Sequence, residues 1–283
     1  MSREAYFRTG LGYIGRDVAF TTTNKRRFGT SFGTTPFICE LIWKGLELKV
    51  PIGTMYYHLL WALLFLKLYS PEAVLSGMIG VDEKTLRKHV WNILRSMNNL
   101  KRKYIRLRDR FQRSNGSACL MSVDGADFKI FNPPFNRMWF SHKFNHAALR
   151  YELAICIQTG LLVWTKGPFP PGDWPDINIF RGWLKGKLLP LERIEADYGY
   201  QGDAKADGPD DHCSTLAQEE LKFTIRGRHE TVNARMKIFG ALSQVYRHKR
   251  EDHHLVFNSF ALITQLVLQY ENPLFSVVYA TEH

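Results

Sequence analysis

The chain has 283 residues, of which 45% are hydrophobic and 23% charged. This composition excludes a disordered or collagen-like chain and allows one large domain or a core domain with a smaller module. The formal net charge of +11 and the pI of about 9.5 favour a polyanionic partner, since each neutralised phosphate releases condensed counterions. A generally basic, solvated surface is the alternative.

The first 35 residues are rich in Gly, Thr and Arg and show little periodicity. We expect residues 1–35 to form a flexible or loosely packed N-terminal arm. Residues 36–113 are predicted to be a helical module. Its most apolar stretch, after Met55, is interrupted by His58 and Lys67 and falls short of about 20 apolar residues. It is therefore predicted to be a buried helix, and no membrane span is expected.

Two helices are predicted inside this module. Ser70 is a plausible N-cap for the first, with Pro71 in its first turn and Val74, Leu75 and Met78 as its apolar face. Gly80 ends it, and Asp82 can cap a second helix whose buried stripe is Leu86, Val90 and Leu94. Two short helices joined by a Gly-containing turn are typical of a helix-turn-helix. An ordinary helical hairpin is the alternative.

The polar face of the second helix carries the candidate DNA contacts of this motif: Lys84, Thr85, Arg87 and Lys88. A basic connector follows over residues 101–113 and begins with Lys101, Arg102 and Lys103. It is predicted either to contact phosphates or only to link two domains.

From residue 118 the pattern changes to that of an α/β domain, expected to span residues 118–275. Strands are predicted over 119–131, 148–158 and 161–167, then an amphipathic helix over 174–188 and a strand over 188–197. Helices over 215–247 and 251–270 complete the series. Three strands, a helix, a strand and further helices predict an α/β fold with a mixed sheet flanked by helices.

Two acidic residues stand at the predicted ends of apolar strands. Asp124 is followed by Gly125, and Asp197 is followed by the sequence Tyr-Gly-Tyr. A rigid sheet can hold carboxylates in the positions that metal chemistry needs. Asp and Gly are also common turn residues, so each position taken alone favours a turn over a metal ligand.

A third group lies on one predicted helix face. Arg226, Glu230, Asn233 and Lys237 recur at spacings of four, three and four, which places them on the same side of a helix. Two cations, a carboxylate and an amide aligned in this way suit metal and phosphate binding. A solvated face with charge pairs four residues apart is the alternative.

These three segments resemble the motifs of the DDE transposases, in particular the Harbinger-like group and its bacterial insertion-sequence relatives. The sequence VDG at Asp124 resembles the first-aspartate motif, and ADYGY around Asp197 resembles the second. The third resembles a Tyr, Arg, Glu, Lys signature, here Phe223, Arg226, Glu230 and Lys237 with its spacing intact. Phe223 replaces the tyrosine and removes a hydroxyl. The 32 residues between Asp197 and Glu230 are close to the family's usual gap.

The resemblance implies a ribonuclease-H-like fold preceded by a helix-turn-helix module. It implies that Asp124, Asp197 and Glu230 are catalytic residues that bind Mg²⁺ or Mn²⁺, with two ions held. Arg226 and Lys237 are then expected to contact phosphate or to orient Glu230. The implied partners are double-stranded DNA, as terminal inverted repeats and target DNA, and a second copy in a homodimer.

The segment PPGDWPDINIF also resembles part of this family, and Asp176 matches it best. We predict Asp176 to be an auxiliary site residue or the N-cap of the helix that follows. It is also the rival of Asp197 for the place of second catalytic aspartate.

The resemblance thus predicts metal-dependent cleavage and strand transfer of transposon-end DNA. A nuclease without strand transfer, and a domesticated DNA-binding protein, are the other hypotheses. The four scattered cysteines form no C-x-x-C pair, so neither a zinc knuckle nor a disulfide framework is expected. With no signal peptide apparent, we expect an intracellular protein, nuclear in a eukaryote and cytoplasmic or nucleoid-associated in a bacterium.

Overall fold

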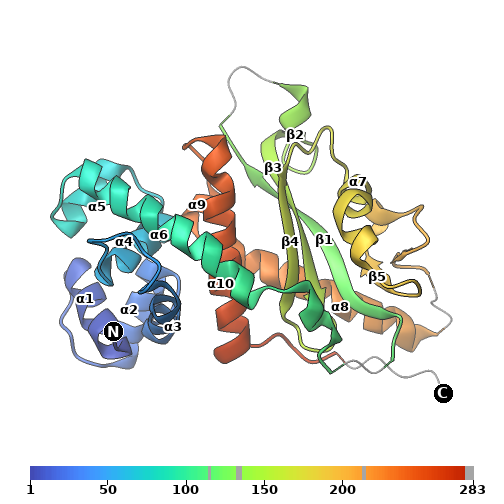
Figure 1. The fold of residues 1–283 in the computed structure, drawn as a ribbon, viewed down its shortest axis with the longest axis horizontal. Helices are drawn as coiled ribbons and strands as arrows, with labels where there is room; N and C mark the ends of the chain where they lie inside the picture. The colour runs from blue at the N-terminus through green and yellow to red at the C-terminus, as the bar shows by residue number, and fades with distance from the viewer. Residues whose placement is uncertain (114–115, 132–135, 212–214, 278–283) are drawn as a thin grey trace. The chain divides into compact units, whose positions relative to one another are not determined.

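The computed structural model describes residues 1–113, 116–131, 136–211 and 215–277. The chain divides into two compact units. A helical unit comprises Met1–Tyr104, Met236–Gln244 and Glu251–Val267, and a sheet-containing unit comprises Ile105–Arg235, Val245–Arg250 and Leu268–His283. Figure 1 labels the elements of both.

The helical unit begins with helices that side-chain caps define. Ser2 accepts a hydrogen bond from Ala5 N, Thr21 from Asn24 N and Thr35 from Ile38 N, so each helix starts where an oxygen meets a free backbone donor. The six helices before residue 105 are α1 (Arg3–Tyr13), α2 (Thr22–Phe32), α3 (Pro36–Leu46), α4 (Tyr57–Leu68), α5 (Glu72–Ile79) and α6 (Glu83–Tyr104).

The expectation of a flexible arm over residues 1–35 is wrong. Two helices, α1 and α2, occupy this segment, and they bury Tyr6, Phe7, Leu11, Phe28 and Phe32. Gly10, one of the glycines that suggested flexibility, serves close packing instead, because a side chain there would collide with the Phe28 ring. The aromatic residues of this segment therefore form part of a core, which its polar composition concealed.

The predicted helix pair corresponds to α5 and α6. Asp82 accepts a hydrogen bond from Thr85 N at 2.9 Å, and Leu86, Val90 and Leu94 are buried, as predicted. Ser70 is not the cap of α5, since Pro71 takes that position without a side-chain bond. Val74 and Met78 are exposed, so only Leu75 of the predicted apolar face is buried.

The basic connector is not an extended linker. Helix α6 continues to Tyr104, and a short 3₁₀ helix follows over Leu107–Phe111. Arg110 lies buried in the sheet-containing unit, where its Nε donates to Glu192 Oε1 at 2.6 Å. Its charge is therefore neutralised within the fold.

The sheet-containing unit is built on strands β1 (Cys119–Lys129), β2 (Phe140–Ser141), β3 (His146–Cys156), β4 (Leu162–Phe169), β5 (Arg193–Ala196) and β6 (Ala206–Asp207). Both β2 and β4 pair antiparallel with β3, which pairs antiparallel with β1; β5 then pairs parallel with β1, and β6 with β5. The predicted α/β fold with a mixed sheet is confirmed. The predicted strand over 188–197 is shorter, because only its last residues pair.

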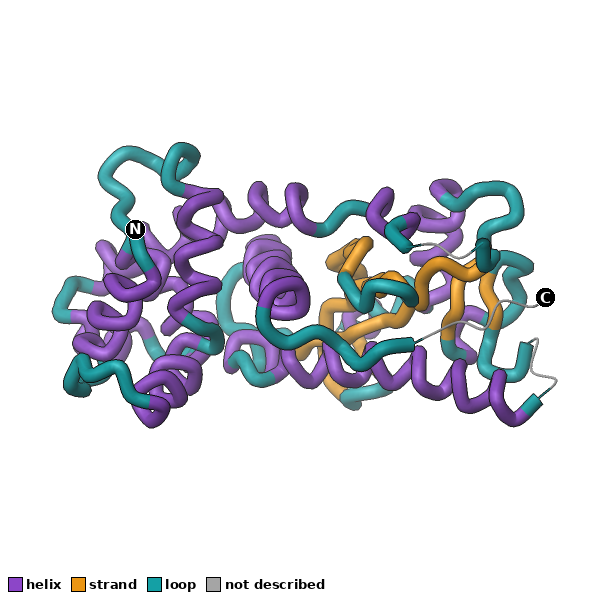
Figure 2. Tube along the Cα trace, turned by 90° about the horizontal axis from the view of Figure 1, so that it is seen from below, coloured by secondary structure: helices purple, strands orange, loops and turns teal. Residues whose placement is uncertain are grey.

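Helices cover both faces of this sheet (Figures 1 and 2). On one face, Phe180 and Leu184 pack against Met121, Val123 and Ile194. Both come from a helical run that starts with α7 (Asp176–Ile179) and continues as a π-helix over Phe180–Leu184. On the other face, Ile225 of α8 (Leu216–Lys237) packs with Cys119 and Ile157. Cys119 and Met121 face opposite helices although they are two residues apart, because the pairing of β1 with β5 is irregular between them.

The C-terminal part departs from the predicted domain boundary. The helix expected over 215–247 ends at Lys237, because Phe239 is extended, and a short α9 (Gly240–Ser243) follows. Helix α9 and most of α10 (His253–Tyr270) belong to the helical unit, so the sheet-containing unit is not the continuous segment 118–275.

The described residues bear on the predictions about membrane-spanning helices and about the cysteines. None of their helices combines the length and the apolar character that crossing a membrane requires. Cys39, Cys119 and Cys156 are free and buried, and Cys213 lies outside the described residues.

Candidate active site

Asp124 and Asp197 are brought together by two neighbouring parallel strands. The pairing of β1 with β5 ends at Val123 opposite Ala196, so the two aspartates are the next residues on adjacent strands. Asp124 does not end its strand as predicted, because β1 continues to Lys129 in its pairing with β3. Asp197 does follow the end of β5, as predicted.

Asp124 sits in a desolvated position beneath α8. Its Oδ2 accepts a hydrogen bond from Asn233 Nδ2 at 3.3 Å. The pKa of Asp124 is raised to about 6: burial contributes most and the nearby Asp197 carboxylate adds to it, whereas Lys143 and hydrogen bonds act in the opposite direction. Such a carboxylate gains from a cation more than an exposed one does, because its charged form is poorly solvated.

Asp197 is exposed and has the turn role that the sequence left open. Its Oδ1 accepts a hydrogen bond from Gly199 N at 2.9 Å and so caps a short 3₁₀ turn over Tyr198–Tyr200. A methyl group placed on Gly199 would lie 3.0 Å from Asp197 Oδ1 and 3.3 Å from Asp176 Oδ2. The turn thus fixes one carboxylate next to another.

Asp176 is a member of this group and not an N-cap. It is the first residue of α7, and Pro175 takes the cap position. Any side chain at Gly125 would collide with Asp176 Oδ1, so this glycine lets the carboxylate approach β1 directly beside Asp124. Asp176 Oδ1 is buried and has no hydrogen-bond partner among the described residues. Asp176 and Asp197 are therefore neighbours beside the same turn.

The charge balance at Asp176 favours an additional cation. Burial raises the pKa of Asp176 to about 6; Arg150 opposes this rise, while Asp127, Asp197 and Asp124 add to it. Arg150 NH1 lies 3.5 Å from Asp176 Oδ2, but the same guanidinium donates to both oxygens of Asp127 at 2.7 and 2.9 Å. One arginine thus serves two carboxylates, which leaves the group of aspartates with excess negative charge.

Sequence reasoning missed Arg150, Asp127 and Glu152, which support the site from β1 and β3. Glu152 lies opposite Gly125 in the sheet and is fully buried. Its Oε1 accepts a hydrogen bond from Trp164 Nε1 at 2.9 Å, and burial raises its pKa to about 8. The signal in the sequence was the pair of charged residues inside an otherwise apolar strand, at 150 and 152.

Helix α8 presents different residues to the sheet than the motif suggested. His229 shares a hydrogen bond of 2.9 Å with Ser122 Oγ, and burial lowers the pKa of His229 to about 4. Together with Asn233, it holds α8 along β1. Glu230 lies on the exposed side of the helix, and Phe223 is 71% exposed. The described contacts therefore join Asp124, Asp176 and Asp197 and do not include Glu230.

The two auxiliary cations differ in their surroundings. Arg226 lies near the Asp197 turn, where its charge lowers the pKa of Tyr198. The hydrogen bond from Tyr198 to Asp210 has the larger effect and raises that pKa. Its Nε is buried and has no hydrogen-bond partner among the described residues. Lys237 is the last residue of α8, is exposed, and belongs to the helical unit.

The predicted DNA contacts on α6 differ in how far their charges are already paired. Arg87 forms an ion pair with Glu72 of α5, and Lys101 Nζ donates to Asn258 Oδ1 at 2.9 Å. Lys103 lies over the Tyr104 ring at 5.7 Å. The others in the set are Lys84, Lys88 and Arg102, which are exposed, and Thr85, which is partly buried.

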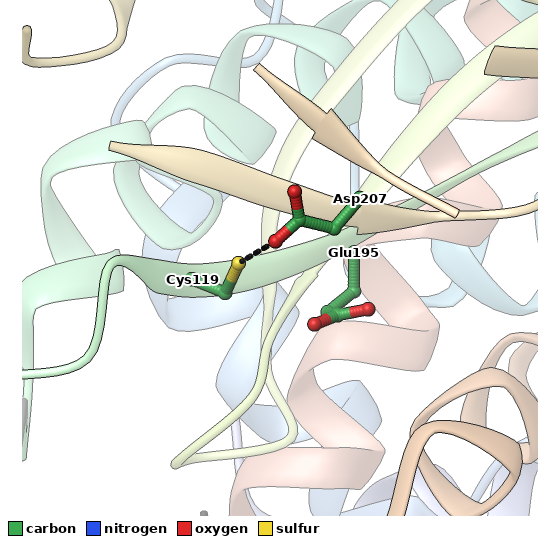
Figure 3. A group of neighbouring side chains, drawn as sticks. All are labelled: Cys119, Glu195 and Asp207. Atoms are coloured by element: carbon green, nitrogen blue, oxygen red, sulfur yellow. Dashed lines mark hydrogen bonds between the residues drawn. The ribbon is translucent and has the colours of Figure 1, made fainter. Parts of the chain in front are cut away.

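A second group of metal-type ligands lies elsewhere on the same sheet. Donor atoms of Cys119, Glu195 and Asp207, on β1, β5 and β6, lie within 4.8 Å of one another, which is close enough to hold a metal ion (Figure 3). Cys119 Sγ donates to Asp207 Oδ2 at 3.2 Å. Burial, Glu195 and Asp207 all raise the pKa of the thiol, which disfavours the thiolate that metals bind.

Cations of the protein already neutralise this second group. Lys222 Nζ lies 3.3 Å from Glu195 Oε2, and both side chains are no more than 6% exposed. Arg193 Nε lies 3.1 Å from Asp207 Oδ2. The group is therefore a buried ion-pair network in which lysine and arginine occupy the place of an external cation.

Comparison of the chain with protein-family models, with curated proteins and with solved structures finds no match.

Proposed function

We propose that the chain is a metal-dependent DNA endonuclease that cuts and joins DNA in the manner of a DDE transposase. The observation that carries the proposal is the convergence of Asp124, Asp176 and Asp197 beside the end of the β1–β5 pairing. Two of these carboxylates have a pKa raised to about 6, and one of their oxygens is buried without a partner.

The donor set fits Mg²⁺ or Mn²⁺. Both ions prefer carboxylate oxygens, and the three aspartates provide several within a small region and without a full set of basic partners. When bound there, such ions would supply Lewis-acid stabilisation of the phosphoryl oxygens and activation of a water or a 3′-hydroxyl. Glu230 remains the predicted motif carboxylate. We propose Asp176 as an additional metal ligand, alongside Asp124 and Asp197.

The residues around the carboxylates support a phosphodiester substrate. Arg226 lies beside the Asp197 turn with a buried nitrogen that has no described partner, so its guanidinium is available for an anion. Asn233 and the turn at Gly199 hold Asp124 and Asp197 in position. In phosphoryl transfer the protein mainly positions groups and stabilises charge, which this arrangement suits.

The topology supports the same proposal. Three antiparallel strands (β1, β3 and β4), then the helical run of α7, then two strands parallel to β1, form the series that a ribonuclease-H-like domain would have. The first two aspartates of the DDE motif then belong on the adjacent parallel strands, where Asp124 and Asp197 lie. The net charge of +11 favours DNA as the partner.

The test is cleavage of duplex DNA by the purified full chain with Mg²⁺, Mn²⁺ or EDTA, using the genomic sequences that flank the reading frame. Asp124→Asn, Asp176→Asn and Asp197→Asn are each expected to reduce cleavage at least about 100-fold and to retain DNA binding. Asp173→Asn is the matched control, since Asp173 is exposed three residues before Asp176. It is expected to cleave normally.

Cleavage by all three site variants at the unmodified rate would contradict the proposal. Specific DNA binding without any cleavage by the unmodified chain would favour a domesticated DNA-binding protein instead. Glu230→Gln belongs in the same series, because its loss or retention of activity decides whether the exposed glutamate completes the site. Strand transfer of pre-cleaved ends separates a transposase from a nuclease.

A further inference from the structure

A pocket of about 600 Å³ lies on the helical unit at α1 and α2, in the segment that the sequence suggested to be a flexible arm. Its polar lining consists of three arginines and three hydroxyl residues: Arg16, Arg26, Arg27, Thr23, Thr30 and Ser31. Ile14 is the remaining lining residue. No acidic side chain lines the pocket.

The sequence of α2 creates this concentration of donors. Thr23, Arg26, Arg27 and Thr30 recur at spacings of three and four residues, which places them on one helix face. Arg16 comes from the connection between α1 and α2 and also lines the pocket. Asn24, buried next to this face, fixes that connection by donating to the Asp17 and Ala19 carbonyl oxygens.

The charge of these arginines is not neutralised by the described side chains that surround them. Arg27 NH1 donates to the neutral Asn24 Oδ1 at 3.1 Å. The nearby Asp17 carboxylate accepts from Ala19 N and Asn24 Nδ2 and so holds the connecting loop. On α6, by contrast, Arg87 is already paired with Glu72. Three guanidinium groups gathered without a carboxylate repel one another, and a bound anion relieves that repulsion.

We infer that this pocket, which we call the α2 arginine pocket, binds phosphate groups of a DNA backbone. The choice of DNA rests on the function proposed above. Guanidinium forks match phosphate oxygens in pairs, and serine and threonine hydroxyls are common phosphate donors. All three arginines are exposed and only one lining residue is apolar, whereas small-molecule sites are mostly apolar and enclosed. A phosphodiester backbone passing over the surface fits this lining better than a small ligand.

The test measures the salt dependence of duplex-DNA binding by the full chain, using fluorescence anisotropy. The triple variant Arg16→Gln, Arg26→Gln, Arg27→Gln is compared with a control, Arg8→Gln, Lys44→Gln, Lys49→Gln, which removes three exposed charges from the same unit. The plot of log K against log salt is expected to become shallower in the pocket variant. The magnitude of its negative slope should decrease by about 2 to 3, because each phosphate contact contributes about 0.9. The control is expected to change the slope by less than half as much.

Equal changes in the two triple variants, or no change in the pocket variant, would overturn the inference. Adenosine diphosphate serves as a small-molecule probe. If it binds at micromolar concentration through the three arginines while the DNA slope is unaffected, the pocket is a nucleotide site and the inference is likewise overturned.

The two proposals fail separately in this design. Asp124→Asn is expected to keep the full salt slope and lose cleavage. The pocket variant, assayed at protein concentrations that saturate the DNA, is expected to cleave within a few-fold of the unmodified chain. An unchanged slope in a pocket variant that still cleaves overturns the pocket alone. Binding without cleavage by the unmodified chain overturns only the proposed catalysis, and absence of DNA binding overturns both.

Discussion

Two groups of acidic side chains lie on one sheet of this protein and have opposite electrostatic surroundings. Glu195 and Asp207 each lie beside a basic residue, Lys222 and Arg193, at 3.3 and 3.1 Å. In the group of Asp124, Asp176 and Asp197, the arginine beside Asp176 also binds Asp127, and two of the three aspartates have a pKa raised to about 6. The tighter cluster of possible metal ligands, Cys119, Glu195 and Asp207, is thus the one whose negative charges are balanced by basic residues.

The comparison shows that proximity of metal-type ligands is a weaker criterion for a site than the balance of charge around them. Where the protein supplies its own cations, a buried acidic group needs nothing further. Where it leaves desolvated carboxylates with too few cations to balance them, the fold loses stability that an external cation can restore. The following predictions test this contrast.

The largest expected effect is at the paired group. Lys222→Met removes the cation that lies 3.3 Å from the buried Glu195 carboxylate, so we expect it to reduce the free energy of unfolding by about 3–5 kcal/mol. Urea denaturation followed by circular dichroism measures the change. The double variant Lys222→Met, Glu195→Gln is the matched control and is expected to recover much of the loss. A change below about 1 kcal/mol in the single variant would mean that the pair is not a structural element.

In the aspartate group we expect replacement of Asp124 to increase stability. The pKa of Asp124 is about 6 in the folded chain and 3.8 when unfolded, so its contribution to stability is present below pH 4 and is lost as the pH rises through 6. Asp124→Asn is therefore expected to raise the free energy of unfolding by about 1–3 kcal/mol at pH 7 in EDTA, and by much less at pH 4.

The same variant tests the role of the cation. Addition of Mg²⁺ is expected to stabilise the unmodified chain and to leave Asp124→Asn almost unchanged, so the difference between them should shrink or reverse. Thermal unfolding with and without Mg²⁺ measures this. If Asp124→Asn is less stable than the unmodified chain at pH 7 in EDTA, neighbouring groups already balance the Asp124 charge. The two acidic groups would then not differ in charge balance.

The smallest effect is expected at Cys119. Its thiol donates to Asp207, and a serine hydroxyl can make the same hydrogen bond. We expect Cys119→Ser to change the free energy of unfolding by less than about 1 kcal/mol, equally with and without EDTA. Metal analysis of the purified chain is the second measurement. A bound thiophilic metal that the serine variant lacks would make this group a metal centre after all.

Several features of the candidate site could be predicted from local sequence. Asp197 follows an apolar strand, and Asp82 precedes a helix with a periodic buried stripe, because strand ends and helix caps depend on residues close in the chain. The division into a helical part and a mixed-sheet part also follows from periodicity, since helices and strands repeat at different intervals.

The sequence by itself thus determined most of the helices and strands after residue 35, and that Asp197 follows a strand. Only the tertiary structure decided which carboxylates share a site, because Asp176 and Asp124 meet across a glycine far from Asp176 in the chain. It also decided that Glu230 is exposed, that residues 1–35 pack as helices, and that the Glu195 group is neutralised by distant residues. Pairing of charges and burial depend on neighbours in space, which residue spacing along the chain does not specify.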